Sequence, residues 1–471
     1  VGGVLGVLLA MATVPLTQQA TAGTLPRLEE TRIDGTVLLF ALALCALTAV
    51  AFGVVPALHA SRGDLQTGLR QGGRGSSDGA ARGRLRVLFV GEVAVALVLL
   101  TGAGLLMRSL AGLVSVDPGF KPQGVTAIPI VLPATRYAEP ARQAELYRQL
   151  LERAAALPGV EAAAATSYVP LSGAFRFVFF CPEGRVCEGI GKDPVIAQRQ
   201  ITPGYFEATR TPLRRGRAFT AADSAQSLPV VIVNETTARR YWPGADPIGK
   251  HLANSRDKVQ REVVGVAADV KFRSLDAPNI EEMYLPLAQS PWPAMTLLVR
   301  SEADPRPLVA SVRQELARLD PDIAVSGIQS LDEIVGASVA QPQLVERCVA
   351  AFAMLALVLA SIGIYGVMSY SVAERTREFG IRMALGAGPR DIMGIVLGEG
   401  MGLTLAGLGL GLAASLAFTR LLSSLLFGVS ATDPLTFGGA VVVLTATALL
   451  ACSLPAWRGM RLPPLRALRE A

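Results

Sequence analysis

The sequence has few residues of the types that bind metals or catalyse hydrolysis. Its 471 residues include two histidines, His59 and His251, and five cysteines, none of which form a CxxC pair. A zinc or haem site needs more ligands than these residues offer. The chain also lacks the GxSxG and HExxH motifs of serine hydrolases and zinc proteases. We therefore predict no catalytic centre, no metal site and no cofactor bound by this chain.

Charged residues are scarce as well. They make up 17% of the chain, whereas hydrophobic residues make up 51%, and the mean hydropathy is +0.42. This balance is unusual for a soluble domain and predicts several membrane spans of roughly 20 residues each. The predicted spans are Gly35–Leu58, Val87–Met107, Cys348–Ala373, Gly400–Thr419 and Pro434–Trp457, with Val1 to about Leu16 as the outer end of a further one. Because the chain begins with Val inside that apolar run, we expect it to be a fragment of a longer protein.

The arginines orient these spans. They are concentrated in residues 59–86, 371–391 and 458–471. The short loops on the other side of the predicted membrane contain Arg27, Arg32 and Arg420. Positive residues mark the cytoplasmic side, so residues 108–347 are predicted to be extracytoplasmic. Residues 113–342 hold 25 basic and 25 acidic side chains, so the net charge of +6 belongs to the membrane portion. The charge therefore indicates membrane topology and no nucleic-acid partner.

An internal repeat and a glycine-rich segment predict how the chain is divided. Asp34–Gln71 aligns without gaps with Asp433–Glu470, including a shared Pro-Ala and a shared Leu-Arg pair. The segment QGGRGSSDGAARGR at residues 71–84 has the composition of a flexible linker. The expected parts are the end of a first membrane half at 1–70, a cytoplasmic linker at 71–84, the first span of a second half at 85–112, an extracytoplasmic domain at 113–342 and three further spans at 343–471.

The extracytoplasmic segment alternates two kinds of pattern. Ala141–Leu157 and Pro307–Leu319 have helical periodicity, and several short β-branched runs predict strands. The predicted strands are Val125–Leu132, Val230–Val233, Val263–Val266, Met295–Val299 and Ile323–Val325. The fold class is therefore an α-helical polytopic membrane protein with a large α+β extracytoplasmic domain.

Two features of this domain leave alternatives. Cys181 and Cys187, in CPEGRVC, would form a disulfide in an oxidising compartment, and two free thiols are the alternative. Gly244–His251 nearly matches a phosphate-binding loop. We reject it because His251 replaces the Ser or Thr that binds magnesium and Pro247 removes a backbone N–H. We expect a turn between a helix and a strand there instead.

Three features of the spans suggest contacts. Glu92 and Glu399 lie near span ends, where each carboxylate either reaches the lipid headgroups or serves as a buried proton relay. The span Gly400–Thr419 is rich in small residues, including Gly402, Gly407 and Gly409, and is expected to pack closely against another helix, within the chain or between two copies.

The charged segment 371–391, SVAERTREFGIRMALGAGPRD, lies between two spans. Its apolar residues, which include Phe379, Ile381 and Leu385, recur at helical spacing. One interpretation is a short helix on the cytoplasmic membrane surface that docks into a groove of a cytosolic partner. The alternative is a solvated connector that reverses the chain.

Several motifs resemble one family. Ala360–Ile392, ASIGIYGVMSYSVAERTREFGIRMALGAGPRDI, is similar to the FtsX-like permease domain of ABC transporters of the MacB and LolCE type. Ile201–Phe219 and Val230–Lys250 resemble the MacB-type periplasmic core domain. With the partial preceding half, the chain is most similar to duplicated orphan permeases, which lack a fused nucleotide-binding domain.

This resemblance implies a multi-pass protein of the bacterial inner membrane that works with a separate cytosolic ABC ATPase dimer, which binds the ATP. Segment 371–391 would be the coupling helix that contacts the ATPase. The residues expected to make this contact are Arg375, Glu378, Ile381, Arg382, Leu385 and Gly386. A periplasmic adaptor and an outer-membrane channel would be further partners.

The leading functional hypothesis is an export permease in which ATP hydrolysis by the partner moves the extracytoplasmic domain. A second hypothesis is an FtsX-like transmembrane regulator of an envelope enzyme that transports nothing. A third is lipoprotein release of the LolCE type.

Overall fold

The computed structural model describes residues 34–49, 76–302, 305–323, 325, 327–421 and 426–460, together with Gly6 and Met11. These residues form two compact units: Val1–Gly112 with Gln341–Ala471, and Leu113–Ala340. Most of the predicted first membrane half at 1–70, the start of the predicted linker, and the end of the internal repeat after residue 460 lie outside the described residues.

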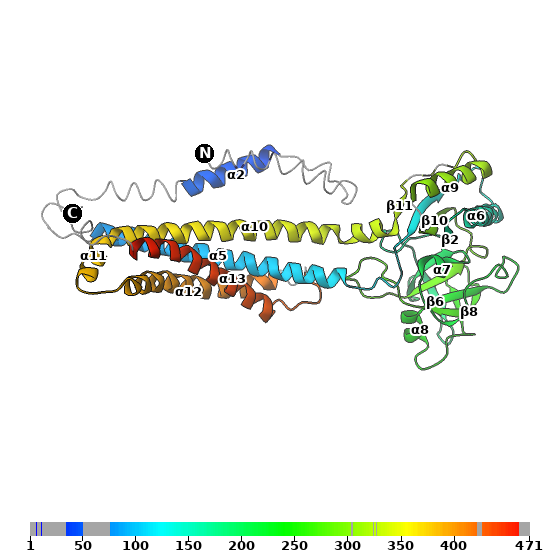
Figure 1. Ribbon diagram of the computed structural model, residues 1–471. Helices are drawn as coiled ribbons and strands as arrows, with labels where there is room; N and C mark the ends of the chain where they lie inside the picture. The colour runs from blue at the N-terminus through cyan, green and yellow to red at the C-terminus, as the bar shows by residue number, and fades with distance from the viewer. Residues whose placement is uncertain are drawn as a thin grey trace. The chain divides into compact units, whose positions relative to one another are not determined.

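Helices build the first unit, and most of them are long (Figure 1). They are α2 Gly35–Ala49, α5 Ser76–Val114, α10 Leu331–Glu374, α11 Thr376–Ala384, α12 Pro389–Leu421 and α13 Pro434–Met460. Within the described residues, four stretches are long and apolar enough to cross a membrane: Arg86–Val114, Leu331–Glu374, Pro389–Leu421 and Pro434–Arg458. Four of the five predicted full spans are therefore confirmed. The fifth is described as helix only over Gly35–Ala49.

The prediction of a flexible linker was wrong for residues 76–84, which form the beginning of α5. Once a spanning helix has formed, each residue added at its end gains a hydrogen bond without a new nucleation cost. Ala80 and Ala81 also belong to the residue type with the highest helix propensity. Extension of α5 therefore outweighs the flexibility expected from glycine and serine.

Helices α5, α10, α12 and α13 run side by side (Figure 1) and share one apolar core. Its buried members include Val93 of α5, Ile364 of α10, Leu408 of α12, and Leu444 and Cys452 of α13. Lipid chains are as apolar as these side chains, so close packing between helices carries much of their association.

Helices α5 and α12 approach closely at glycine residues. A Cβ atom built on Gly407 would lie 2.7 Å from the Cβ of Val93, and one built on Gly411 would lie 3.0 Å from the Cβ of Leu97. Further along, the hydroxyl of Thr101 donates a hydrogen bond of 3.1 Å to that of Ser415. Residue numbers increase together along both helices, so α5 and α12 are parallel.

The second unit contains strands and shorter helices. Its described strands are β1 Val125–Val131, β2 Val160–Thr166, β3 Phe177–Pro182, β4 Val195–Ile201, β5 Leu213–Gly216, β6 Val230–Asn234, β7 His251–Asn254, β8 Gln260–Ala267, β9 Glu282–Pro286, β10 Ala294–Ser301 and β11 Gln329–Ser330. Its described helices are α6 Pro140–Ala155, α7 Tyr205–Thr209, α8 Glu235–Tyr241 and α9 Pro305–Leu319. Both predicted helices and four of the five predicted strands are confirmed. The predicted strand Ile323–Val325 contributes an isolated bridge from Val325 to Ile130, and the chain then turns at Gly327, which has a positive φ of 67°.

The strands form one sheet in the order β11-β1-β10-β2-β4-β3-β7-β8-β6-β9, and β9 also pairs with β4 in parallel. The six strands from β4 to β9 in this order therefore close a circuit, while β2, β10, β1 and β11 form an open arm. One apolar cluster, which includes Phe180, Val231 and Leu252, joins the strands of the circuit. A second cluster packs α6 and α9 against the arm, with Leu150 and Leu297 among its buried members.

A fully buried ion pair joins two strands of the circuit. Arg199 of β4 lies 2.7 Å from Glu282 of β9, and neither side chain is more than 1% exposed. The guanidinium also donates to the hydroxyl of Tyr205 at 2.7 Å, and the hydroxyl of Tyr284 donates to Glu282 at 2.8 Å. The centroid of the Phe272 ring lies 5.1 Å from the guanidinium carbon. Removing both charges from water is costly, and their mutual attraction and these hydrogen bonds offset that cost.

We expect Gly407→Val to destabilise the protein because the new side chain would overlap Val93 and push α5 and α12 apart. The expected loss is about 1–3 kcal/mol, the usual cost of overpacking. Gly409→Val is the matched control, since a Cβ at Gly409 meets no described atom within 4 Å. Thermal unfolding of the detergent-solubilised variants measures the difference, and equal melting temperatures would contradict this packing.

Arg199→Met should destabilise the second unit by about 3–5 kcal/mol, because it leaves Glu282 buried without its cation. The double variant Arg199→Met with Glu282→Gln removes both charges and should recover a large part of that loss. Hydrogen exchange of β4 and β9 in the full chain reports the effect. Slow exchange in the single variant, as in the unaltered protein, would show that the pair does not stabilise these strands.

Candidate coupling site

Segment 371–391 forms a short helix between the ends of two spans. Helix α10 continues to Glu374, α11 covers Thr376–Ala384, and α12 begins at Pro389. Arg375 separates α10 from α11 with φ of −97° and ψ of 12°. The surface helix is therefore shorter than the expected 371–391, because the ends of that segment continue the backbone hydrogen bonding of the adjacent spans.

The end of α11 is set by Gly386. Its φ of +101° lies in the region that glycine adopts most easily. The N–H of Gly386 donates to the carbonyl of Met383 at 3.1 Å, and the N–H of Ala387 donates to that of Arg382 at 2.9 Å. This pair of bonds is a Schellman motif, which satisfies carbonyls at the helix end. The expectation that Gly386 allows the helix to end agrees with this geometry.

The start of α12 is also capped. The carboxylate of Asp391 accepts a hydrogen bond of 2.8 Å from the N–H of Gly388, and Pro389 occupies the first helical position. A third-position acid that reaches back to the N-cap and a proline at the first position both favour a helix start. The corner between α11 and α12 is therefore short and hydrogen-bonded on both sides.

The apolar residues of α11 and its C-cap residue, Leu385, divide between two faces. Phe379 is 1% exposed and belongs to the apolar core of the first unit. Ile381 and Leu385 point away from that core, and Leu385 is 83% exposed. Arg382 and Glu378, one helical turn apart, form an exposed ion pair of 2.6 Å. The exposed members of the predicted contact set are Glu378, Ile381, Arg382, Leu385 and Gly386.

Arg375, the remaining member of that set, pairs with Glu399 of α12. Its guanidinium lies 3.1 Å from Oε2 of Glu399, and the hydroxyl of Ser371 donates to the same oxygen at 3.3 Å. Oε1 of Glu399 accepts from Arg86 of α5. The Glu399 side chain is only 17% exposed. One carboxylate thus contacts residues from α5, from α10 and from the bend before α11.

Sequence reasoning treated Glu399 and Glu92 as isolated acids and missed these contacts. Glu399 and Arg86 are separated by 313 residues, so no local pattern links them. The available signal was an acid at one span end and arginines at the ends of two others. Glu92 lies elsewhere on α5, with its carboxylate against Gly363 of α10.

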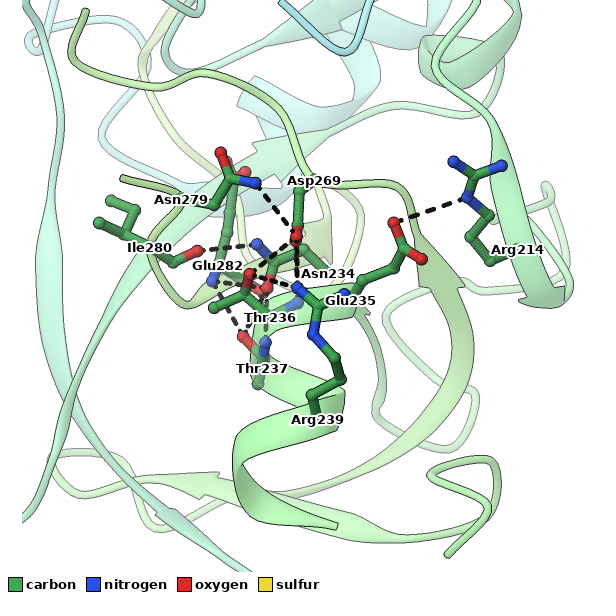
Figure 2. A network of polar contacts seen from close by, with 10 residues as sticks. All are labelled: Arg214, Asn234, Glu235, Thr236, Thr237, Arg239, Asp269, Asn279, Ile280 and Glu282. Carbon is green, nitrogen blue, oxygen red and sulfur yellow. Dashed lines mark hydrogen bonds and ion pairs between the residues drawn. The ribbon is translucent and has the colours of Figure 1, made fainter. Parts of the chain in front are cut away.

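A second polar cluster surrounds the start of α8 (Figure 2). The Asn234 side chain accepts from the N–H of Thr237 at 3.0 Å and donates to the carbonyl of Ile280 at 2.7 Å. Asp269 accepts from both the N–H and the hydroxyl of Thr236, each at 2.8 Å, and from Arg239 at 2.9 Å. These bonds connect α8 to the segments that follow β8 and precede β9. The arrangement therefore positions a helix.

The segment that nearly matches a phosphate-binding loop leads into β7. Glu183 accepts from the N–H of His251 at 2.8 Å and from the ammonium of Lys250 at 3.3 Å. The hydrogen bond from the His251 N–H is the main cause that lowers the pKa of Glu183 below its usual range. The hydrogen bond from Lys250 is the next largest cause. The lysine that a phosphate would need is thus paired with a carboxylate. Glu183 itself lies between Cys181, near the end of β3, and Cys187, and these two cysteines form a disulfide.

Two family models match this chain. Residues 88–315 match the MacB-like periplasmic core domain, and residues 350–464 match the FtsX-like permease C-terminal domain. Together with the four candidate spans, these matches define a membrane protein with an extracytoplasmic segment. The chain therefore contains a MacB-like periplasmic core domain and an FtsX-like permease C-terminal domain.

The chain is similar to several curated transport proteins. It is 29% identical over 286 residues to the macrolide export ATP-binding/permease protein MacB of Bdellovibrio bacteriovorus, covering 57% of this chain and 43% of that protein. It is 27% identical over 278 residues to the pyoverdine export ATP-binding/permease protein PvdT of Pseudomonas putida, covering 56% and 41%. The chain thus spans less than half the length of these relatives. Among solved structures, the periplasmic region of MacB from Actinobacillus actinomycetemcomitans matches 47% of this chain and 95% of that chain, with 15% identity and a TM-score of 0.33.

Gly386→Ala should loosen the end of α11, because a non-glycine residue in the left-handed conformation costs roughly 1–2 kcal/mol. We expect faster hydrogen exchange over residues 383–388. Gly394→Ala is the control, since Gly394 lies inside α12 with no described atom within 4 Å of a new Cβ. If the two variants exchange at the same rate over residues 383–388, the positive φ of Gly386 does not limit the stability of this turn.

Proposed function

We propose that this chain is the permease subunit of a MacB-type ABC transporter of the bacterial inner membrane, and that α11 docks on a cytosolic ATPase dimer. The observation that carries the proposal is the division of α11 into two faces. Phe379 anchors the helix in the bundle, while Leu385 and Ile381 offer exposed aliphatic side chains. A short helix with such a face fits a groove on a partner protein.

Charge adds specificity to this face. Glu378 and Arg382 lie one helical turn apart on the exposed side and pair with each other. Exposed pairs contribute little to stability, so both side chains are available to exchange partners on docking. Charged groups at the rim of an interface set orientation and partner choice more than affinity.

The path of the chain supplies a route from this face to the second unit. The chain leaves the first unit between Gly112 and Leu113, within α5, and returns between Ala340 and Gln341, within α10. A partner that binds α11 differently in its ATP-bound and ATP-free states would shift the equilibrium between two arrangements of these helices. The second unit, outside the membrane, would then handle a cargo for export.

Leu385→Glu should abolish stimulation of the partner ATPase in reconstituted membranes, because it buries a charge in the apolar groove. Leu228→Glu is the matched control, since Leu228 is 76% exposed in the second unit. ATP hydrolysis by the co-purified ATPase in proteoliposomes provides the measurement. Full stimulation by the Leu385 variant would exclude this face of α11 as the docking surface.

A further inference from the structure

We infer that Glu399 is the joint through which a displacement of α11 moves both helices that lead into the second unit. The inference rests on the proposed function, because a partner must displace α11. It gives Glu399 a positioning role.

The first step is that α11 and α12 move together. The corner between them is closed by the Schellman bonds at Gly386 and by the Asp391 cap of Gly388. At the other end of α11, Arg375 has no side-chain cap bond and leaves helical geometry. Displacing α11 therefore displaces α12, while the bend at Arg375 absorbs rotation relative to α10.

The second step concerns connectivity. The chain passes between the two units within α5 and α10, whereas α12 and α13 lie wholly in the first unit. A displacement of α12 reaches the second unit only if α12 engages those two helices. Apolar packing is non-directional, and the directional bond between Thr101 and Ser415 joins α12 to α5 but does not reach α10.

The third step is the geometry of the Glu399 carboxylate. One oxygen accepts from Arg86 of α5, and the other faces Arg375 of the bend and Ser371 near the end of α10. The pairs are directional, and the carboxylate is mostly buried, so solvent ions screen them less than an exposed pair. Glu399 therefore fixes the position of α12 along both helices with a single side chain.

The test uses Glu399→Gln in the full chain, in lipid nanodiscs with its co-purified ATPase. The amide keeps the shape and the bond to Ser371 but removes the charge. Hydrogen exchange of residues 86–93 and 367–374 is measured with and without a non-hydrolysable ATP analogue. In the unaltered protein, nucleotide should change both segments. In Glu399→Gln, the ATPase should still co-purify, neither segment should respond, and ATPase stimulation should fall about fivefold or more.

Two further variants sharpen the test. Arg86→Gln removes the contact to α5 alone, so residues 86–93 should lose their response while residues 367–374 keep it. Glu346→Gln is the control, because Glu346 is an α10 acid without an ion pair among the described residues. We expect both responses to persist in that variant.

The outcomes separate the joint from the proposed function. Nucleotide responses that persist in Glu399→Gln would overturn the joint and leave the docking proposal intact. If no ATPase co-purifies with the unaltered chain, or if nucleotide changes neither segment, the proposed function is wrong. Glu399 would then have no displacement of α11 to transmit.

Discussion

The close parallel approach of α5 and α12 is the constraint on which the inner end of the first unit depends. Val93 lies against Gly407, and Thr101 bonds to Ser415. The spacing between such contacts is seven or eight residues, or about 11 Å of helix. One such interval before Val93 and Gly407 come Arg86 and Glu399, which form the ion pair. The small residues of α12 therefore bring the charged residues within reach, and a wider separation of the helices would remove that contact.

The sequence predicted those elements whose residue pattern directly reflects the environment of each face, such as lipid or the apolar core. The long apolar runs of α10, α12 and α13 form helices because a backbone in lipid must bond to itself. Helices α6 and α9 have one apolar stripe, which packs against the sheet as the periodicity indicated. The β-branched runs of β1 and β6 form strands that lie in the interior of the second unit.

The elements that were missed depend on distant neighbours. The strand β2, VEAAAAT, has the composition of a helix. It lies between β10 and β4, where Ala164 and Ala165 are fully buried, so tertiary packing outweighs propensity. The same reason applies at the coupling site. The exposed residues of α11 could be predicted from residue type and spacing. The pairing of Arg375 could not, because it depends on Glu399, and packing against other helices determines where α12 places that residue.

Two short strands lie at edges of the sheet in the second unit. The arm ends in β11, which has two residues. The four-residue strand β5 pairs with β8 through three partner pairs, with a register shift between Leu213 and Arg215. Long, flat edges invite pairing with other chains, whereas short, bulged or charged edges discourage it. Arg214 and Arg215 place two charges on β5. The shortness of β11 and the register shift and charges of β5 therefore disfavour edge-to-edge pairing between two copies of the domain at these two strands.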